Sequence, residues 1–236
     1  MDERFSRTAI LLGEAGMARL AGARVAVFGV GGVGGHCVLA LARAGVGAID
    51  VFDDDVVSAT NINRQAVAMT STLGRPKVDV IREQVLDINP QAQVRCHRMF
   101  YTPENADTVA LSAYDYIVDA IDTVKAKTEL IVRAHAAGVP IVSAMGAGNK
   151  LDPTRFELAD IYETSVCPLC RTMRAQLKKR GVPQHRVVYS REEPLHAVAD
   201  AAQGRHAPGS VSFVPPVAGL ILAGEVIRNL ANEGSV

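Results

Sequence analysis

The sequence lacks an excess of charge of either sign. Of its 236 residues, 25 are Lys or Arg and 25 are Asp or Glu, so the formal net charge is zero. No overall positive charge points to a nucleic-acid partner, and such a partner has to be held by a local basic patch. Hydrophobic residues make up 48% of the chain. That is enough for a sizeable core in one domain, or in one domain with an extension.

Long apolar segments are also missing. The longest apolar stretch, residues 211–227, is interrupted by prolines, glycines and Glu225. These interruptions make it a poor membrane span and favour a buried helix. The N-terminus, Met-Asp-Glu-Arg-Phe, is charged rather than apolar, unlike a signal peptide. We therefore expect a cytoplasmic protein that does not use a membrane.

Cysteine is scarce, and the chain has only four: Cys37, Cys96, Cys167 and Cys170. We expect them to stay free thiols in a reducing cytoplasm. Cys167 and Cys170 form one C-x-x-C pair, but a structural zinc ion takes four ligands and no second pair exists. Three histidines lie near or beyond the pair without a common zinc spacing: His185, His196 and His206. Zinc at Cys167 and Cys170 is therefore not expected, and redox or inter-subunit pairing stays open.

The sequence does contain a regular alternation of strands and helices. Strands are predicted over residues 24–28, 48–52, 93–96, 114–120 and 139–144. Helices are predicted between them, over residues 37–44, 75–88, 103–111 and 124–137. This alternation is typical of parallel strands joined by right-handed crossovers. We predict an α/β, Rossmann-like fold, with a mostly parallel twisted sheet flanked by helices.

A glycine-rich turn links the first predicted strand to the first predicted helix. Gly29-Val-Gly31-Gly32-Val-Gly34 fits the pattern G-x-G-x-x-G. In this context glycine permits a tight turn and lets backbone N–H groups approach a phosphate at a helix N-terminus. Asp53, at the end of the second strand, is placed to hold a ribose hydroxyl. The pattern predicts a bound nucleotide.

The residues that follow Asp53 favour ATP over a dinucleotide. Arg64 and Lys77 can supply the positive charge that a triphosphate needs, and Asn61 a hydrogen bond. Asp122 follows the fourth strand, at the sheet edge where ligands bind, and a carboxylate there can hold Mg²⁺. An NAD(P)-dependent dehydrogenase leaves these residues without a role. A non-catalytic nucleotide-binding scaffold is a further alternative.

Together these motifs resemble the E1-like adenylating superfamily, which includes the ubiquitin-activating enzymes and the sulfur-carrier adenylyltransferases. The resemblance covers about residues 4–148. It implies that Asp53 binds ribose, that Arg64 and Lys77 bind phosphates, and that Asp122 binds magnesium. We assign nine residues to the nucleotide site: Gly29, Gly31, Gly32, Gly34, Asp53, Asp55, Asn61, Arg64 and Lys77.

The resemblance also implies a homodimer. It implies that Arg7, on the leading helix, reaches into the partner's active site as an arginine finger. The alternative is that Arg7 lies at an exposed, basic start of this helix. Residues 1–148 then form an ATP-binding adenylation domain with an N-terminal helix. Residues 149–236 predict strand segments, a basic helix and a terminal apolar helix. We expect them to form a mixed C-terminal extension of the same fold that serves substrate binding and dimerisation.

Adenylation suits a carboxylate substrate. A free carboxylate resists nucleophilic attack, whereas attack on the α-phosphate of ATP turns it into an acyl-adenylate with AMP as the leaving group. Positioning and charge neutralisation do most of this work. The predicted catalytic residues are Arg7, Arg64, Lys77 and Asp122.

The whole chain resembles the bacterial tRNA threonylcarbamoyladenosine dehydratases, and this resemblance continues past the core shared by the superfamily. The matching segments are residues 143–155, 160–166, 168–169, 187–194 and 209–215. The resemblance implies that ATP adenylates the threonyl carboxylate of N6-threonylcarbamoyladenosine at position 37 of the anticodon loop. The carbamoyl group then closes a ring, with AMP and pyrophosphate released.

Two departures from that family matter for the cysteines. Residues 195–207 are short and lack the cysteine-rich insertion of some members, and no thiol follows Cys170. We therefore assign no catalytic cysteine. The alternative substrate is the C-terminus of a sulfur-carrier or ubiquitin-like protein, whose enzymes usually carry two C-x-x-C pairs. A sulfur-transfer or cysteine desulfurase partner also stays open.

A local basic patch agrees with tRNA. Residues 171–191 hold seven basic residues and no acidic ones, and such a patch can face phosphates. Charge runs are also typical of a solvated helix face. The predicted tRNA contacts are Arg171, Arg174, Lys178, Lys179 and Arg180. Tyr162 or Tyr189 is a candidate for stacking on a base, and a core position is the alternative for each.

Overall fold

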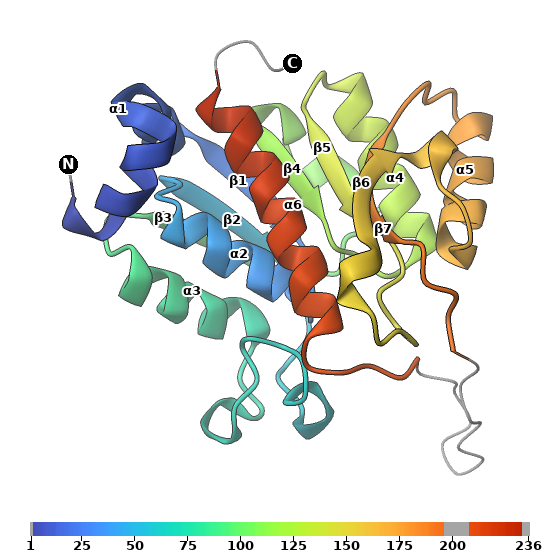
Figure 1. Ribbon diagram of the computed structural model, residues 1–236, viewed down its shortest axis with the longest axis horizontal. Helices are drawn as coiled ribbons and strands as arrows, with labels where there is room; N and C mark the ends of the chain where they lie inside the picture. Colours follow the sequence, from blue (N-terminus) through green and yellow to red (C-terminus); the bar gives the residue numbers. More distant parts are fainter. Residues whose placement is uncertain (1, 196–207, 233–236) are drawn as a thin grey trace.

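A seven-stranded sheet forms the centre of the molecule (Figure 1). The computed structural model describes residues 2–195 and 208–232, and over these the strand order is β3-β2-β1-β4-β5-β7-β6. The strands are β1 (Arg24–Phe28), β2 (Ala48–Phe52), β3 (Gln93–His97), β4 (Tyr116–Asp119), β5 (Ile141–Ala144), β6 (Phe156–Asp160) and β7 (Arg186–Ser190). Neighbouring strands are parallel except β6 and β7, which pair antiparallel. The predicted α/β, Rossmann-like fold is confirmed.

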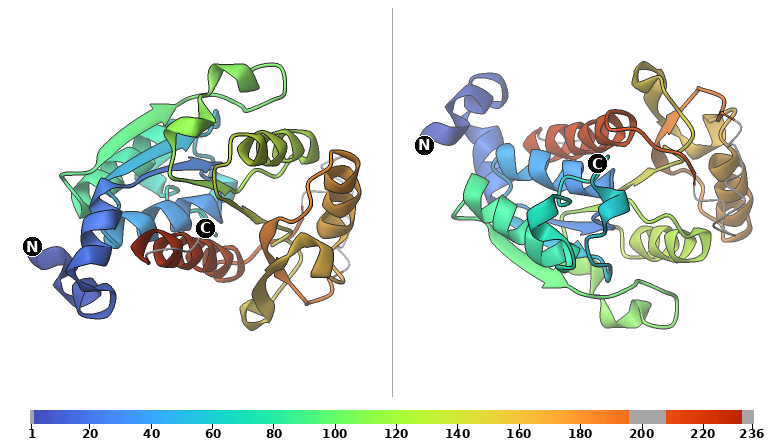
Figure 2. Two further views of the ribbon diagram at one scale, coloured as in Figure 1. Left: turned by 90° about the horizontal axis from the view of Figure 1, so that it is seen from above. Right: turned by 90° about the horizontal axis from the view of Figure 1, so that it is seen from below.

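Helices cover both faces of the sheet (Figure 2). They are α1 (Ser6–Gly22), α2 (Gly34–Arg43), α3 (Lys77–Ile88), α4 (Val124–Ala136), α5 (Pro168–Lys179) and α6 (Val214–Ala231). One core joins α1, α2, α3 and α6 to one sheet face, and a second joins α4 and α5 to the other. Because both faces are covered, β4 and β5 are buried along their whole length and read as apolar runs.

The strand order places a ligand crevice at one edge of the sheet. From β1 the chain proceeds outward through β2 to β3, and then returns to β4 on the other side of β1. The loops that leave the carboxyl ends of β1 and β4 therefore diverge to opposite faces. In open α/β sheets such a switch point leaves a crevice between the two loops. The glycine turn follows β1 and residues 120–122 follow β4, so both border this crevice.

Helix α6 is long and apolar enough to cross a membrane, judged by length and composition alone. In the structure it lies across the sheet and packs on α1 and α2 (Figure 1). A Cβ atom added to Gly219 would lie 2.2 Å from the carbonyl oxygen of Val33, so α6 approaches the start of α2 closely. Leu222 and Val226 on α6 are fully buried. The predicted buried helix at residues 211–227 is confirmed.

Two features differ from the simplest sequence prediction. The predicted helix at residues 103–111 is wrong, because the structure has two short 3-10 turns there, Ala106–Thr108 and Leu111–Ala113. Asn105 bonds instead to the loop before it, since its side chain accepts from the Thr102 amide at 2.8 Å and donates to the Phe100 carbonyl at 2.8 Å. The second feature is that β7 pairs directly with β5. Residues after 148 thus complete the same sheet, and a domain division at 148 stays a prediction.

Candidate functional site

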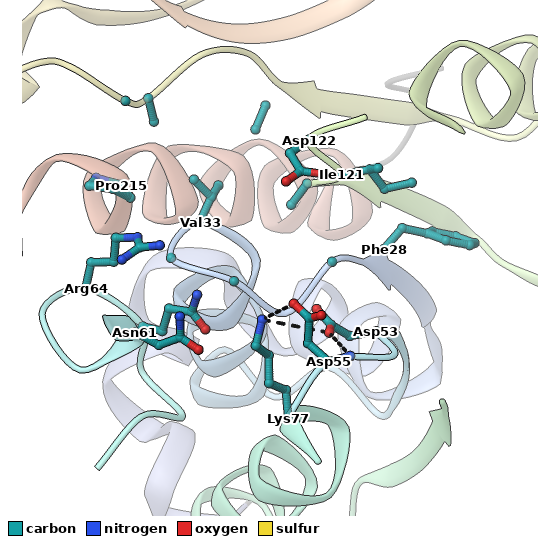
Figure 3. Close-up of a pocket in the computed structure, with 18 of the residues that line it drawn as sticks. Phe28, Val33, Asp53, Asp55, Asn61, Arg64, Lys77, Ile121, Asp122 and Pro215 are labelled. Carbon is teal, nitrogen blue, oxygen red and sulfur yellow. Dashed lines mark hydrogen bonds and ion pairs between the residues drawn. The ribbon is translucent and has the colours of Figure 1, made fainter. Parts of the chain in front are cut away.

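A pocket of about 770 Å³ lies at the carboxyl ends of the central strands (Figure 3). Its lining includes the glycine turn after β1, the segment after β2, residues 120–122 after β4, and residues 144–148 at the end of β5 and just beyond it. Nine of the residues predicted for the site are among its lining: Gly29, Gly31, Gly32, Asp53, Asp55, Asn61, Arg64, Lys77 and Asp122. The sequence pattern therefore selected residues that the fold does bring together.

The glycines of the turn have different roles. Gly29 has a φ of +91°, and a Cβ there would lie 2.6 Å from the Ala120 carbonyl oxygen. A Cβ at Gly34 would lie 1.8 Å from the Gly29 carbonyl oxygen, so Gly34 closes the turn and does not line the pocket. Gly31 has only the tip of Gln65 within 4.0 Å. Its bare backbone is where a phosphate can approach the start of α2.

Asp53 ties the glycine turn to the end of β2. Its Oδ2 accepts a hydrogen bond from the Val30 amide at 2.7 Å, and its Oδ1 accepts from the Asp55 amide at 2.9 Å. Burial raises the pKa of the Asp53 carboxyl, and the Lys77 ammonium opposes that rise. The carboxylate is thus fixed in orientation at the pocket wall, where a ribose hydroxyl is the expected donor.

Lys77 is a buried cation at the start of α3. Its Nζ lies 2.6 Å from Oδ2 of Asp55 and 4.0 Å from Oδ1 of Asp53, and the residue is only 4% exposed. The three side chains gather on one side of the pocket (Figure 3). A rigid ammonium facing a cavity is suited to an anionic ligand, because burial limits screening by water.

Asn61 and Arg64 come from one short loop. The Asn61 Oδ1 accepts from the Ser58 amide at 3.1 Å, and Arg64 donates through Nη1 to the carbonyl oxygen of Thr60 and to Oδ1 of Asn63, each at 2.9 Å. These local bonds hold the guanidinium at the pocket rim (Figure 3). Arg64 therefore adds a second cation at some distance from the Lys77 side.

Asp122 lies across the pocket from Lys77 (Figure 3). It is exposed, three residues beyond the end of β4, and the described part of the chain gives it no hydrogen-bond partner. A free carboxylate on a pocket wall fits Mg²⁺, which uses one or two protein carboxylates and otherwise keeps waters and substrate phosphates. The carboxylates of Asp53, Asp54 and Asp55 also lie within 4.8 Å of one another, but Lys77 pairs with this group.

A buried polar network holds the loop that carries Asp122. Lys127 and Asp119 are both fully buried, with Nζ 2.7 Å from Oδ2. Lys127 also donates to the Ala144 carbonyl at 2.9 Å, and Oδ1 of Asp119 accepts from the Ile121 amide at 3.1 Å. Ser143 donates to Asp119 at 2.6 Å, and His185 Nε2 lies 2.8 Å from the Ser143 hydroxyl. Two loops that line the pocket are therefore tied to one ion pair.

Sequence reasoning missed two polar groups that line the pocket. Gln65 is 8% exposed and its Oε1 has no partner, and Tyr101 is 3% exposed with an unpartnered hydroxyl, counting the residues placed in the structure. Buried polar atoms normally find a partner, so these two suit contact with a ligand. Gln65 directly follows Arg64 and was within reach of the sequence motif. Nothing in the sequence marks Tyr101, whose place depends on the loop after β3.

Other predicted residues lie outside the pocket. Arg7 is exposed on α1, and the pocket is built without it. Arg174 on α5 donates to the Thr164 carbonyl at 2.8 Å, and Arg180, just after the helix, pairs with Glu129 at 3.0 Å. Arg171, Lys178 and Lys179 are exposed and have no ion-pair partner among residues 2–195 and 208–232. Fewer basic side chains are therefore available on this patch than the sequence suggests.

The structure also tests the predictions made for the tyrosines and for His185. Tyr189 is 1% exposed and donates to Glu157 at 2.7 Å, so its proposed stacking on a base is wrong. Tyr162 is half-buried, and its hydroxyl donates to the Val182 carbonyl at 2.6 Å. His185 contacts Ser143 rather than the cysteines. His196 and His206 lie outside the described residues.

Comparison with known proteins gives the family. A model of the ThiF family matches residues 5–236. The tRNA threonylcarbamoyladenosine dehydratase of Bacillus subtilis (strain 168) is 41% identical over 245 residues, which covers 99% of this chain and 96% of that protein. The adenylyltransferase and sulfurtransferase uba4 of Aspergillus niger is 31% identical and spans 95% of this chain, but only 43% of that protein.

Solved structures agree with this comparison. The crystal structure of Escherichia coli tRNA N6-threonylcarbamoyladenosine dehydratase, TcdA, in complex with AMP superposes with a TM-score of 0.89 and 32% identity, covering 97% of this chain and 94% of that one. The same enzyme in complex with ATP gives a TM-score of 0.88. The chain therefore belongs to the ThiF family and, within it, to the tRNA threonylcarbamoyladenosine dehydratases.

Proposed function

We propose that this chain uses ATP to adenylate the threonyl carboxylate of N6-threonylcarbamoyladenosine at position 37 in the anticodon loop of tRNA, and then closes that group to a ring. The observation that carries the proposal is the match along nearly the whole length of the Bacillus subtilis dehydratase. It extends through β6, α5 and β7, beyond the glycine turn and the other nucleotide-site residues. The pocket supports it with two cations, a bare glycine backbone and a free carboxylate.

Adenylation is the first step. The triphosphate lies along the glycine turn, with Lys77 and Arg64 neutralising its charge and Asp53 accepting from a ribose hydroxyl. The threonyl carboxylate attacks the α-phosphorus, the bond from that phosphorus to the bridging oxygen breaks, and pyrophosphate leaves. These groups act by positioning and by electrostatic stabilisation, which suits phosphoryl and nucleotidyl transfer.

Asp122 is the residue that we assign to magnesium. When bound, Mg²⁺ neutralises charge on the phosphate oxygens. The network of Lys127 and Asp119 holds the Ile121 amide and so fixes the backbone that presents Asp122. The carboxylate is thereby positioned before the nucleotide arrives.

Ring closure is the second step. The carbamoyl group of the same nucleoside attacks the activated carbonyl carbon, and AMP leaves with the carboxylate oxygen that it gained. The net change in the nucleoside is the loss of one water. Because the attack is intramolecular, it needs no enzyme thioester, and the cysteines take no part in it.

The tRNA is proposed to meet the exposed face of α5. Arg171, Lys178 and Lys179 have no ion-pair partner among the residues that the structure describes, and Leu169 in the first turn of α5 lines the nucleotide pocket. One helix thus joins the basic face to the pocket. Phosphate contacts of this kind position an RNA without reading its sequence.

We also propose a homodimer in which Arg7 acts in the partner's site. Ile10 and Leu11 on α1 are 82% and 84% exposed, and such apolar side chains beside each other suit a protein interface. Arg7 lies on the same helix and outside the pocket. We expect the enzyme to work in the cytoplasm, where its tRNA substrate is modified. A sulfur-transfer partner stays a prediction without support from the site.

The test is a reaction of the purified protein with ATP, Mg²⁺ and tRNA that carries threonylcarbamoyladenosine, followed by mass spectrometry of the nucleosides. The expected product is that nucleoside less one water, formed with equimolar AMP. Asp122→Ala abolishes AMP formation, whereas Asp107→Ala, an exposed carboxylate outside the pocket, leaves it unchanged. AMP formation that depends instead on a protein with a free Gly-Gly end, with unchanged tRNA, contradicts the proposal.

A further inference from the structure

The nucleotide pocket has two chemically different ends. It crosses the carboxyl ends of five neighbouring strands, from the loop after β3 to the loop after β5. At about 4.8 Å per strand, these two loops are roughly 19 Å apart. Phe52, Phe100 and Tyr101 line the β3 end with aromatic side chains, which suit the flat base of a nucleotide. Asp53 after β2 is assigned to the ribose and the glycine turn after β1 to the phosphates, so the nucleotide leaves the β5 end free.

The residues that the structure places at the β5 end of the pocket are all neutral. They are residues 144–148, Leu169, Pro208 and Ser210. In the proposed reaction the substrate carboxylate attacks the α-phosphorus at the glycine turn, and the ribose and base of ATP extend from there toward β3. The group that carries the carboxylate therefore comes from the β5 end. A neutral lining fits its uncharged carbamoyl group and threonyl side chain, whereas pyrophosphate is better held by cations.

Asn149 holds residues 208–210, here called the substrate wall, against the loop after β5. Its φ is +58°, a backbone conformation that asparagine tolerates better than most residues. The Asn149 amide donates to the Gly209 carbonyl at 2.8 Å, and its Oδ1 accepts from the Gly209 amide at 2.6 Å. The Asn149 carbonyl also accepts from the Leu195 amide at 2.7 Å. One residue in a special backbone conformation therefore fixes the position of the substrate wall.

Two further contacts hold the substrate wall. A Cβ added to Gly148 would lie 2.7 Å from the Cβ of Pro208, so the wall packs directly on a bare stretch of backbone. From the loop between β2 and α3, Asn63 donates through Nδ2 to the Ser210 carbonyl at 2.9 Å. The Oδ1 of Asn63 accepts from Arg64 at 2.9 Å. The wall is thus bonded both to the loop after β5 and to the loop that carries a phosphate-binding cation.

We propose that the substrate wall holds the carbamoyl and threonyl groups of the reacting nucleoside, and that Asn149 is the positioning residue that fixes this wall. Asn149 does not itself line the pocket and acts through its bonds to Gly209. A fixed wall keeps the carboxylate directed at the α-phosphorus and the carbamoyl group within reach of the activated carbonyl carbon. This assignment rests on the proposed function, from which it takes the substrate.

Two variants loosen the wall in independent ways. Asn149→Gly keeps a positive φ without strain and removes the side-chain bond to the Gly209 amide, whereas Asn149→Asp keeps an oxygen acceptor at that place and is the matched control. Gly148→Ala adds a Cβ that must push Pro208 aside. Its control is Gly22→Ala, where a Cβ has nothing within 4 Å. Urea unfolding checks that each variant is folded.

The measurement is the affinity of each full-length protein for tRNA with and without threonylcarbamoyladenosine, in the presence of Mg²⁺ and a non-hydrolysable ATP analogue. The unaltered protein is expected to prefer the modified tRNA. Asn149→Gly should lose about three- to tenfold of that preference, the usual effect of one hydrogen bond, and Gly148→Ala should lose as much or more. Both control variants keep the preference. In turnover with ATP, the KM for modified tRNA rises by the same factor.

Two further readouts separate this role from a general loss of structure. Asn149→Gly and Gly148→Ala should bind the ATP analogue as the unaltered protein does, and the salt dependence of tRNA binding should not change, because neither variant removes a charge. A full preference in either folded variant overturns the proposal, and so does weakened binding of the ATP analogue, since the wall would then hold the nucleotide. Failure of the proposed function is distinguishable, because the unaltered protein would then neither prefer nor dehydrate the modified tRNA.

Discussion

At the scale of single residues, the buried pair of Lys127 and Asp119 has the largest consequence for stability. Both side chains are fully buried, so removing the cation leaves an unpaired carboxylate in the core. Lys127→Met is expected to destabilise the fold by about 3–5 kcal/mol, measured by urea unfolding. Lys125→Met on the same helix removes an exposed pair with Glu104 and should leave stability nearly unchanged. Equal effects of the two substitutions contradict the role given to the network.

The glycine turn offers a matched pair of neighbouring residues. A Cβ at Gly34 would meet the Gly29 carbonyl oxygen at 1.8 Å, whereas a Cβ at Gly35 has its nearest contact at 3.7 Å. Gly34→Ala must therefore move the turn, and we expect it to lose ATP binding. Gly35→Ala should bind ATP as the unaltered protein does. Calorimetry with a non-hydrolysable analogue checks both, and normal binding by Gly34→Ala contradicts this account of the turn.

His185 gives a prediction about pH. Burial, with smaller contributions from His135 and Lys127, lowers the pKa of His185 from 6.5 to about 3. Between these values the unfolded chain binds a proton that the folded chain does not, so stability rises with pH. The stability of the fold with neutral, buried His185 is fully present above about pH 6.5. It falls by up to about 1.4 kcal/mol for each pH unit as the pH drops toward 3. Between pH 7 and pH 4, the free energy of unfolding measured with urea should fall less steeply for His185→Gln than for the unaltered protein. An equal fall in the two proteins contradicts this role of His185.

At the scale of elements, the sequence predicts most of what positions the site. The buried runs at residues 24–28 and 48–52 match β1 and β2 residue for residue, because strands covered on both faces are continuously apolar. The helix predicted at residues 103–111 does not form, because the side chain of Asn105 bonds to the loop before it and competes with a helical backbone. The pairing of β5 with β7 places Ser143 and His185 together, which depends on long-range contacts and leaves no local sequence signal.

Helix α5 provides the prediction for RNA at this scale. Lys178 and Lys179 are exposed and lie on its last turn. Reversing both to Glu should weaken tRNA binding and lower the slope of log Kd against log salt concentration by roughly 1–2 units. Arg82→Glu, an exposed cation on α3, is the control and should leave the slope unchanged. Filter binding across salt concentrations measures both, and an unaltered slope in the α5 variant removes this helix from the tRNA interface.

At the scale of the whole molecule, the proposed dimer predicts complementation between two inactive variants. Arg7→Ala lacks the arginine and Asp122→Ala lacks the metal ligand, so each alone is expected to be inactive. When the two chains are mixed and allowed to exchange, half of the dimers are hybrids with one intact site, so about a quarter of full activity should return. Absence of any recovery in proven hybrids shows that Arg7 does not act across the interface.

The central claim is that this pocket activates a carboxylate carried by tRNA. It is tested most directly by incubating the purified protein with ATP, Mg²⁺ and tRNA bearing threonylcarbamoyladenosine. The masses of the nucleosides are then determined by mass spectrometry, and the amount of AMP formed is measured. The account predicts one water lost from that nucleoside for each AMP formed, and no loss when Lys77→Ala or Asp122→Ala replaces the unaltered protein. An unchanged nucleoside, in a preparation that binds ATP, would contradict it.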